Sequence, residues 1–169
     1  MMAESDDQPH FRFNPRAYEP GRAFEASDRI CGHCARPCVW EHVAGYYALN
    51  RVTLCARCIA AGGLEEVLGG HYSFHDCEVA DCDPVLEAEL MERTPGIACF
   101  NPFEWPVIDG VPLAFVGYGE EESLLAIPAV HAAMAAAFED FGWDVGPSPY
   151  AMIFQTLDGE TYRVVVDLD

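Results

Sequence analysis

Two cysteine pairs with the same internal spacing carry the most definite chemistry in this chain. Cys31 and Cys34 enclose Gly-His, Cys55 and Cys58 enclose Ala-Arg, and 20 residues separate the pairs. Two intervening residues let a tight turn aim both sulfurs at one ion about 2.3 Å away, and two such turns complete a tetrahedron. We therefore predict a metal site on Cys31, Cys34, Cys55 and Cys58. Four thiolates leave no position for water or substrate, so the predicted ion is structural. Thiolate ligands favour zinc or iron, and we assign Zn²⁺.

Other interpretations of these cysteines stay open at this stage. Cys38 and His33 lie close enough in sequence to replace one of the four ligands. The four could also be buried thiols without an ion. A redox role for C-x-x-C would need a thioredoxin-like βαβ context, which the surrounding pattern lacks.

A looser set of His71, His75, Cys77, Cys82 and Cys99 could bind a second ion. Its spacing fits no familiar ligand template, so we interpret its members as small core residues and polar loop groups. The acidic run DCEVADCD is interpreted as a solvated loop rather than as catalytic carboxylates.

The cysteine pairs need a local scaffold to bring them together. Aromatic and β-branched residues predict two short strands between Val39 and Leu54, with a turn near Asn50-Arg51. This layout is typical of a zinc-ribbon-like lobe, placed at about residues 28–62. The glycines that end IAAGG and LEEVLGG predict two short helical turns after Cys58.

Two longer helices are predicted beyond this lobe. DPVLEAELMERTPG has Asp83 as a cap, Pro84 at the first helical position and a Pro-Gly stop, with Leu86 and Leu90 facing inward. A second helix begins at Pro128 and ends at Gly142, and its inward stripe comprises Val130, Met134, Phe138 and Phe141.

Strands are predicted around two turn dipeptides. Residues 111–118 form a buried strand after Asp109-Gly110, and Asp158-Gly159 forms a type I′ turn in a C-terminal β-hairpin. That hairpin places Ile153 opposite Val164 and Gln155 opposite Tyr162. The predicted fold class is α+β, a single domain over residues 11–169 after a disordered leader over residues 1–10.

The charge balance limits the partners. The chain has 28 Asp and Glu against nine Lys and Arg, a formal charge of −19. Nucleic-acid binding depends on Lys and Arg that neutralise phosphates, so we expect none. A basic protein partner fits, as does plain solubility. MMAESDDQPH resembles no secretory signal and no stretch approaches the ~20 apolar residues of a membrane span, so we expect a cytoplasmic protein.

Several motifs in series resemble the CbrC family, which is named for a colicin E2 tolerance protein. They are FRFNP, EASD before CGHC, LCARCIAAGG, RTPG, AFVG, a helix ending in FGW and a hairpin ending in VVVDLD. Members carry a C-x-x-C and then a C-P-W-C, which correspond to the four cysteines above, with Ala56-Arg57 replacing Pro-Trp. Many also have His-Cys near Ile108-Asp109 and a Cys-x-x-Cys in the final hairpin, where this chain has TLDG. The resemblance therefore implies that any second metal site of the relatives is lost here unless Cys77, Cys82 or Cys99 substitutes.

We interpret the chain as a non-enzymatic, zinc-stabilised bacterial protein of the interaction, tolerance or immunity type, whose acidic surface binds a basic protein. One alternative is a hydrolase-type enzyme with a pocket near the C-terminal hairpin. Another is a zinc-ribbon nucleic-acid binder. No G-x-S-x-G, H-E-x-x-H or P-loop pattern supports an enzyme. Partner and oligomeric state stay open.

Overall fold

The computed structural model describes residues 6–168, which form two compact units. The first comprises residues 6–76 and 84–98, and the second comprises residues 77–83 and 99–168. The single domain over 11–169 and the leader over 1–10 stay predictions, and residues 1–5 of that leader lie outside the described residues. Of its other residues, Pro9 accepts a hydrogen bond from the Tyr18 hydroxyl (2.6 Å) and Asp7 forms an ion pair with Arg57.

Each unit mixes helices and strands, which confirms the predicted α+β class. The elements of the first unit are β1 (Phe24–Ile30), β2 (Pro37–His42), α1 (Ala56–Ala61), α2 (Glu65–Leu68) and α3 (Pro84–Arg93). The elements of the second unit are β3 (Cys77–Glu78), β4 (Phe103–Glu104), β5 (Val107–Ile108), β6 (Val111–Pro112), β7 (Ala114–Gly119), α4 (Glu122–Leu125), α5 (Pro128–Glu139), β8 (Ser148–Gln155) and β9 (Tyr162–Val166). None of the helices in the described part of the chain has the length and apolarity needed to cross a membrane.

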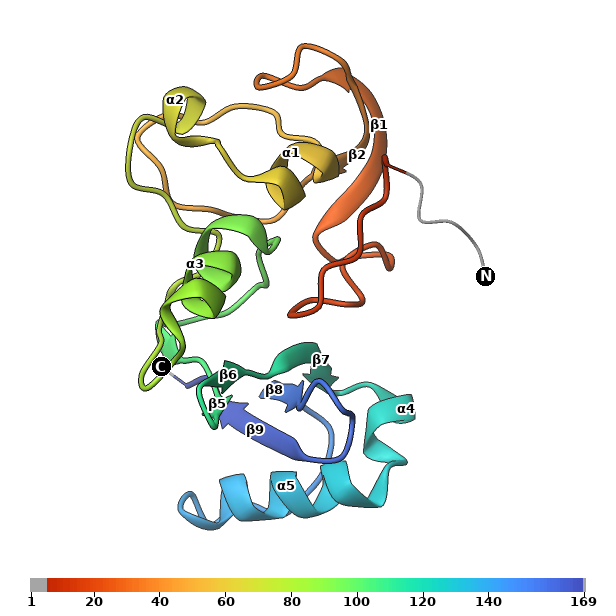
Figure 1. The fold of residues 1–169 in the computed structure, drawn as a ribbon. Helices are drawn as coiled ribbons and strands as arrows, with labels where there is room; N and C mark the ends of the chain where they lie inside the picture. Colours follow the sequence, from red (N-terminus) through yellow and green to blue (C-terminus); the bar gives the residue numbers. More distant parts are fainter. Residues whose placement is uncertain (1–5, 169) are drawn as a thin grey trace. The chain divides into compact units, whose positions relative to one another are not determined.

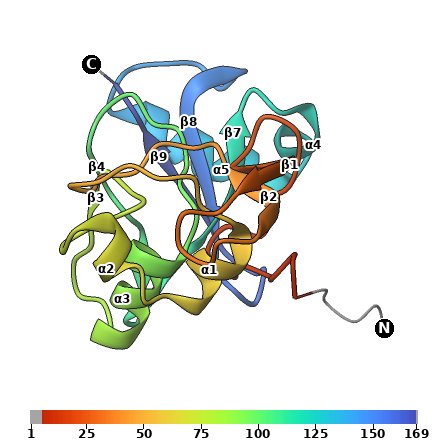
Figure 2. The ribbon, with the colours of Figure 1, turned by 90° about the horizontal axis from the view of Figure 1, so that it is seen from above.

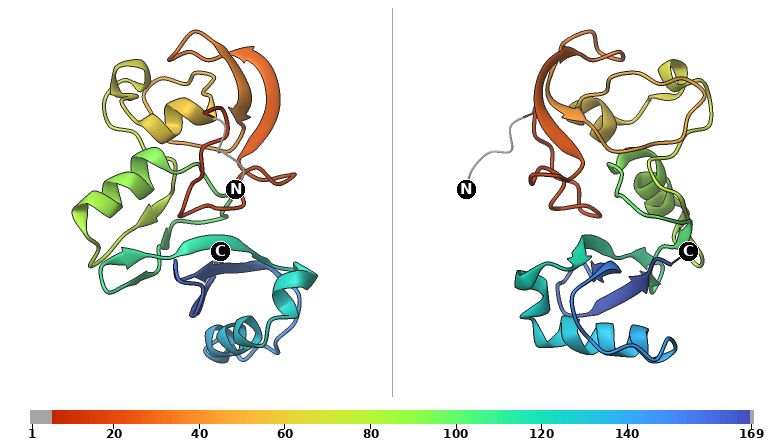
Figure 3. Two further views of the ribbon diagram at one scale, coloured as in Figure 1. Left: turned by 45° about the vertical axis from the view of Figure 1, so that its right-hand side comes forward. Right: turned by 180° about the vertical axis from the view of Figure 1, so that it is seen from behind.

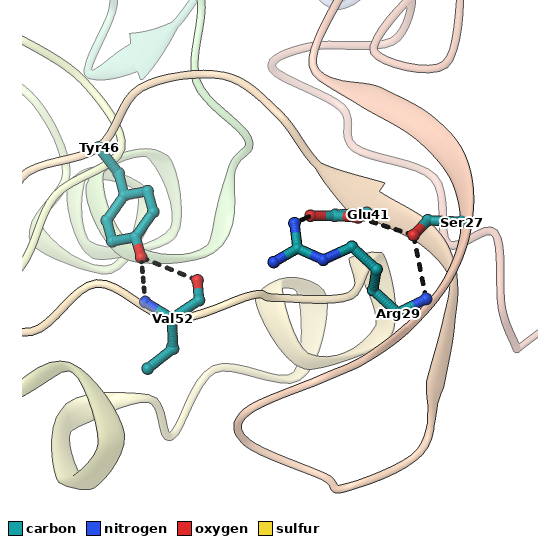
Figure 4. Close-up of polar contacts among 5 residues, drawn as sticks. All are labelled: Ser27, Arg29, Glu41, Tyr46 and Val52. Atoms are coloured by element: carbon teal, nitrogen blue, oxygen red, sulfur yellow. Dashed lines mark hydrogen bonds and ion pairs between the residues drawn. The ribbon is translucent and has the colours of Figure 1, made fainter.

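An antiparallel ribbon of β1 and β2 dominates the first unit, with α1 between the ribbon and α3 (Figure 1, Figure 2). The predicted pair of strands over residues 39–54 is therefore wrong in part, because β2 pairs with the segment before Cys31 and residues 43–54 form a loop. Tyr46 explains the difference. Its hydroxyl accepts the Val52 N–H (2.7 Å) and donates to the Val52 carbonyl (2.9 Å), so both backbone groups are satisfied without a strand partner (Figure 4).

Aromatic residues of the N-terminal segment form part of the core of the first unit. Phe24 stacks on both Phe11 (5.5 Å) and Tyr18 (4.9 Å), and His42 lies edge-on to both Phe24 (5.7 Å) and Phe74 (5.2 Å). Residues 11–22 form successive turns.

The RTPG motif anchors the end of α3 within this unit. Thr94 Oγ1 donates to the Glu89 carbonyl (2.9 Å), and the Pro95 carbonyl accepts from Asn14 Nδ2 (3.1 Å). The Gly96 N–H donates to His42 Nε2 (3.1 Å). A Cβ at Gly96 would lie 2.7 Å from the Gly45 carbonyl oxygen, so the close approach needs glycine.

The second unit is a three-stranded antiparallel sheet, in the order β7-β8-β9, with α5 along one face (Figure 3). Val130, Met134 and Phe138 of α5 are buried against it, as predicted. Phe141 follows the end of α5 and is 46 % exposed, so its placement on the inward stripe is wrong. In α3, Leu90 is buried and Leu86 is half-buried.

Both predicted turns form, one of them with a different geometry. Asp109 and Gly110 have φ of 52° and 78°, and they join β5 to β6 as a tight turn. In the last hairpin the predicted register is confirmed, since Ile153 pairs with Val164 and Gln155 with Tyr162. Its turn is not type I′, because Asp158 keeps a negative φ and only Gly159 is left-handed (79°).

Candidate metal centre

The first cysteine pair lies in a tight turn between β1 and β2. The Cys31 N–H donates to the Arg36 carbonyl (2.9 Å), and the Ala35 N–H donates to the Cys31 carbonyl (3.0 Å). Ala35 takes a left-handed φ of 57° to close the turn. The Gly32 N–H donates to the Thr53 carbonyl (2.8 Å), which joins this turn to the chain just before the second pair.

The second pair spans the start of α1. Cys55 forms a β-bridge with Glu41 and is the N-cap residue of α1, and the N–H of Cys58 donates to the Cys55 carbonyl (3.1 Å). The backbone is extended at Cys55 and helical from Ala56 onward. With this change of backbone, the side chains of Cys55 and Cys58 point to the same group. Backbone contacts thus position both pairs.

The four sulfur atoms form a compact group. All four Sγ atoms lie within 4.8 Å of one another, with Cys31 Sγ 3.8 Å from Cys58 Sγ and Cys34 Sγ 3.9 Å from Cys55 Sγ. A tetrahedron with Zn–S bonds of about 2.3 Å has edges of about 3.8 Å. The donor set and its spacing therefore fit a tetrahedral metal ion, and these cysteines could hold one.

The four-sulfur group is largely shielded from solvent. Cys31, Cys55 and Cys58 are buried and Cys34 is half-buried. His33 Nδ1 lies 3.2 Å from Cys58 Sγ, and an Arg57 guanidinium nitrogen lies 3.8 Å from Cys34 Sγ. Such donors offset part of the negative charge that four thiolates carry.

Side-chain hydrogen bonds between β1 and β2 lie next to Cys55. Glu41, the bridge partner of Cys55, accepts hydrogen bonds from Ser27 Oγ (2.7 Å) and from Arg29 (2.6 Å), and Ser27 Oγ also accepts the Arg29 N–H (3.1 Å; Figure 4). The positive charge of Arg29 thereby offsets the negative charge that Glu41 would otherwise place beside Cys55.

The thiols differ in acidity. Burial raises the pKa of Cys55 to about 11, and burial also raises the pKa of Cys58. Burial acts in the same sense on Cys34, but hydrogen bonds with Arg36 and with neighbouring thiols outweigh it and lower its pKa to about 7. Without a cation, Cys55 and Cys58 thus resist ionisation. A divalent ion would remove that resistance and release protons.

Neither alternative ligand belongs to the four-sulfur group. Cys38 is fully buried, and burial, followed by the charges of Cys31 and Cys55, raises its pKa to about 12. His33 instead lies against Cys58 as a neighbour of the group.

The looser cysteine and histidine set is divided between the units. His71 and His75 belong to the first unit, whereas Cys77, Cys82 and Cys99 belong to the second. Within residues 6–168, Cys31, Cys34, Cys55 and Cys58 form the one group of three or more His, Cys, Asp or Glu ligand atoms close enough to hold a metal ion.

A buried histidine pair was not anticipated from the sequence. His42 and His75 are 7 % and 4 % exposed. Burial lowers the pKa of His42 to about 3, with the charge of His75 adding to the effect, and burial lowers the pKa of His75 to about 4. No spacing rule predicts this pair, because residues 42 and 75 meet only through the fold.

Comparison with known proteins gives one match. The model of an uncharacterised protein family, UPF0167, matches residues 8–167. Searches of curated proteins and of solved structures find no match. The family match covers nearly the whole chain and agrees with the motif series described above, and the chain therefore belongs to UPF0167, the CbrC-like family of uncharacterised proteins.

Proposed function

We propose that this chain is a non-enzymatic binding protein. A structural zinc ion on Cys31, Cys34, Cys55 and Cys58 stabilises its first unit, and its acidic second unit binds a basic protein partner. The tolerance or immunity role implied by the family resemblance belongs to the same proposal, with a basic nuclease toxin as the example partner.

The sulfur geometry supports the structural role of zinc. The two measured Sγ–Sγ distances of 3.8 and 3.9 Å suit tetrahedral zinc, and four cysteines saturate it. A saturated ion has no open position for substrate, so it supplies folding energy rather than catalysis.

The uneven distribution of charge is the observation that carries the binding proposal. The segments of the second unit, 77–83 and 99–169, contain 15 acidic residues against one arginine, Arg163, a formal charge of −14. The remaining segments contain 13 acidic residues and eight arginines. A field of one sign on one unit raises the association rate of an oppositely charged partner, whereas solubility alone needs no such segregation.

Nucleic-acid binding is disfavoured by the pairing of the arginines. Arg12, Arg16 and Arg29 form ion pairs with Glu89 (2.5 Å), Glu19 (2.7 Å) and Glu41 (2.6 Å). Phosphates would have to compete with these carboxylates.

The hydrolase alternative gains no support from a pocket of the first unit. This pocket has a volume of about 90 Å³ and is lined by His10, Phe11, Ala60, Glu89, Arg93 and Thr94. Its carboxylate, Glu89, is bound by two nitrogens of Arg12 (2.8 and 2.5 Å), which removes it as a general base.

A binding titration against a colicin-type nuclease domain tests the proposal. We expect affinity at low ionic strength that falls about tenfold or more between about 50 and about 200 mM salt. A neutral globular protein serves as the control and is expected not to bind. Absence of binding at low salt, or binding that salt does not weaken, would remove the proposal.

A further inference from the structure

Backbone hydrogen bonds and a left-handed glycine define the geometry of the segment that ends α5. The Trp143 N–H donates to the Phe138 carbonyl (3.2 Å), the Gly142 N–H donates to the Glu139 carbonyl (3.1 Å), and Gly142 has a left-handed φ of 65°. This is a Schellman motif, whose usual apolar contact is present because the Trp143 ring packs against Phe138 at 5.5 Å. The motif therefore fixes the backbone from which residues 141 and 143 project.

Two aromatic side chains are left at the surface by this geometry. Phe141 is 46 % exposed and Trp143 is 41 % exposed, and their rings contact each other at 5.1 Å. The Trp143 side chain contacts the buried Phe138 and so contributes to the core. The Phe141 side chain buries a smaller fraction of its surface than Trp143 does. Exposed aromatic side chains, Trp above all, are enriched among the residues that anchor protein interfaces.

The charges around the two rings oppose the stability of the free helix. Glu139, Asp140 and Asp144 are all exposed and lie within two residues of Phe141 or Trp143 in sequence, and the last turn of α5 contains no basic residue. A helix C-terminus carries partial negative charge and is stabilised by cations, so carboxylates at this position are unfavourable. A cationic partner would relieve that repulsion.

We infer that Phe141, Trp143, Glu139, Asp140 and Asp144 form the docking site for a basic segment of a partner protein. We refer to these five residues as the acidic–aromatic site. An arginine or lysine of the partner stacks on the exposed rings while the carboxylates and the end of α5 neutralise its charge. The inference rests on the proposed function, since it names the part of the acidic unit that makes contact.

The test uses the full-length, zinc-loaded protein and a fluorescein-labelled nona-arginine peptide, with binding followed by anisotropy. The site variant is E139Q/D140N/D144N. Its control is E120Q/E122Q/E160Q, which removes the same charge from three exposed carboxylates elsewhere in the second unit. A third variant, Phe141→Ala, removes a ring without changing charge, and the Schellman hydrogen bonds are retained because they use only the backbone.

The inference predicts at least a fivefold loss of affinity in the site variant and less than twofold in the control, with Phe141→Ala weakening binding about threefold. The melting temperature of the free site variant is expected to rise, because repulsion at the end of α5 is removed. This rise shows that any loss of binding is not a loss of folding.

The other outcomes separate the two proposals. If both triple variants weaken binding equally and Phe141→Ala changes nothing, the docking site is wrong while the acidic unit remains the binder. If the unmodified protein does not bind the peptide at low salt, the docking site and the proposed function both fail.

Discussion

A metal ion bound by the four-sulfur group would have to displace protons from its thiols, and three of these thiols differ in acidity. Cys34 has its pKa lowered to about 7, whereas burial keeps Cys55 and Cys58 protonated in the absence of a cation. We expect zinc affinity to rise with pH from about 6 to 8 and binding at pH 7 to release protons. Calorimetry in buffers of different ionisation enthalpy measures the release, and binding without proton release would contradict the assignment of thiol ligands.

The second prediction at the residue scale separates ligands from neighbouring thiols. Cys55→Ser removes one of the four proposed ligands, so we expect loss of bound zinc and unfolding of the first unit, since structural zinc contributes about 10 kcal/mol in small zinc domains. Cys38→Ala removes an equally buried thiol outside the ligand group, and we expect the variant to retain its zinc at a cost of about 1 kcal/mol. Metal content and circular dichroism of both variants check this. Retained zinc in Cys55→Ser would overturn the ligand set.

A third prediction concerns the strained turn that contains the first two cysteines and ends at Ala35. Ala35 has a φ of 57°, a conformation that costs an L-residue about 1 kcal/mol and costs glycine almost nothing. Ala35→Gly should therefore raise the free energy of unfolding by up to about 1 kcal/mol. The matched control, Ala135→Gly at an exposed position of α5, should lower it by about 1 kcal/mol. A loss of stability in Ala35→Gly would contradict the described turn.

At the scale of elements, the contact between the end of β2 and the chain after α3 depends on a neutral histidine. His42 Nε2 accepts the Gly96 N–H, which requires that the ring proton be on Nδ1. A proton on Nε2 would face another N–H and break this hydrogen bond. The same ring is enclosed by Phe24, Tyr46 and Phe74, so its charged form would also lose hydration.

This contact predicts acid sensitivity of the first unit. Because the folded pKa values of His42 and His75, about 3 and about 4, lie below the ordinary 6.5, their stabilising effect is complete above pH 6.5 and is lost as the pH falls below it. The loss is on the order of 1 kcal/mol per pH unit for each histidine. His42→Gln, whose amide oxygen can still accept the Gly96 N–H, should show a shallower fall in unfolding free energy between pH 6.5 and 5 than the unmodified protein. His131→Gln, exposed on α5, is the control, and equal slopes in all three proteins would refute the explanation.

Elements specified by local signals were predictable from the sequence. Pro84 and Pro128 begin α3 and α5, and Asp158-Gly159 lies in a hairpin whose register was predicted correctly. Elements that depend on distant partners were not. β1 pairs with β2 across the first cysteine turn, and the expected second strand is replaced by a loop because the Tyr46 side chain satisfies the backbone of Val52.

The candidate sites were likewise predictable only where their signal was local in sequence. The cysteine spacing predicted the four-sulfur group because each C-x-x-C turn is local and the pairs needed only to meet. Phe141 was placed on the buried stripe by its spacing from Phe138, but Gly142 ends the helical geometry and leaves the ring at the surface. The sequence EDFGWD, with three carboxylates around two aromatic residues, was the signal that could have indicated an exposed site.

For the whole molecule, the different charge of the two units was hidden by their interleaving in sequence. Residues 77–83 belong to the second unit although α3 follows them in the first. A total charge of −19 therefore concealed an acidic unit and a unit that carries eight of the nine arginines. We propose that a metal ion stabilises the first unit and that the second unit recognises the basic partner.

The metal content of the purified protein, determined by elemental analysis, tests the central claim most directly. The account predicts one zinc per chain, lost together with the structure of the first unit when a strong chelator is added at pH 7. Two zinc ions per chain would contradict the finding of a single ligand group within residues 6–168. A folded protein without metal would contradict the structural role assigned to Cys31, Cys34, Cys55 and Cys58.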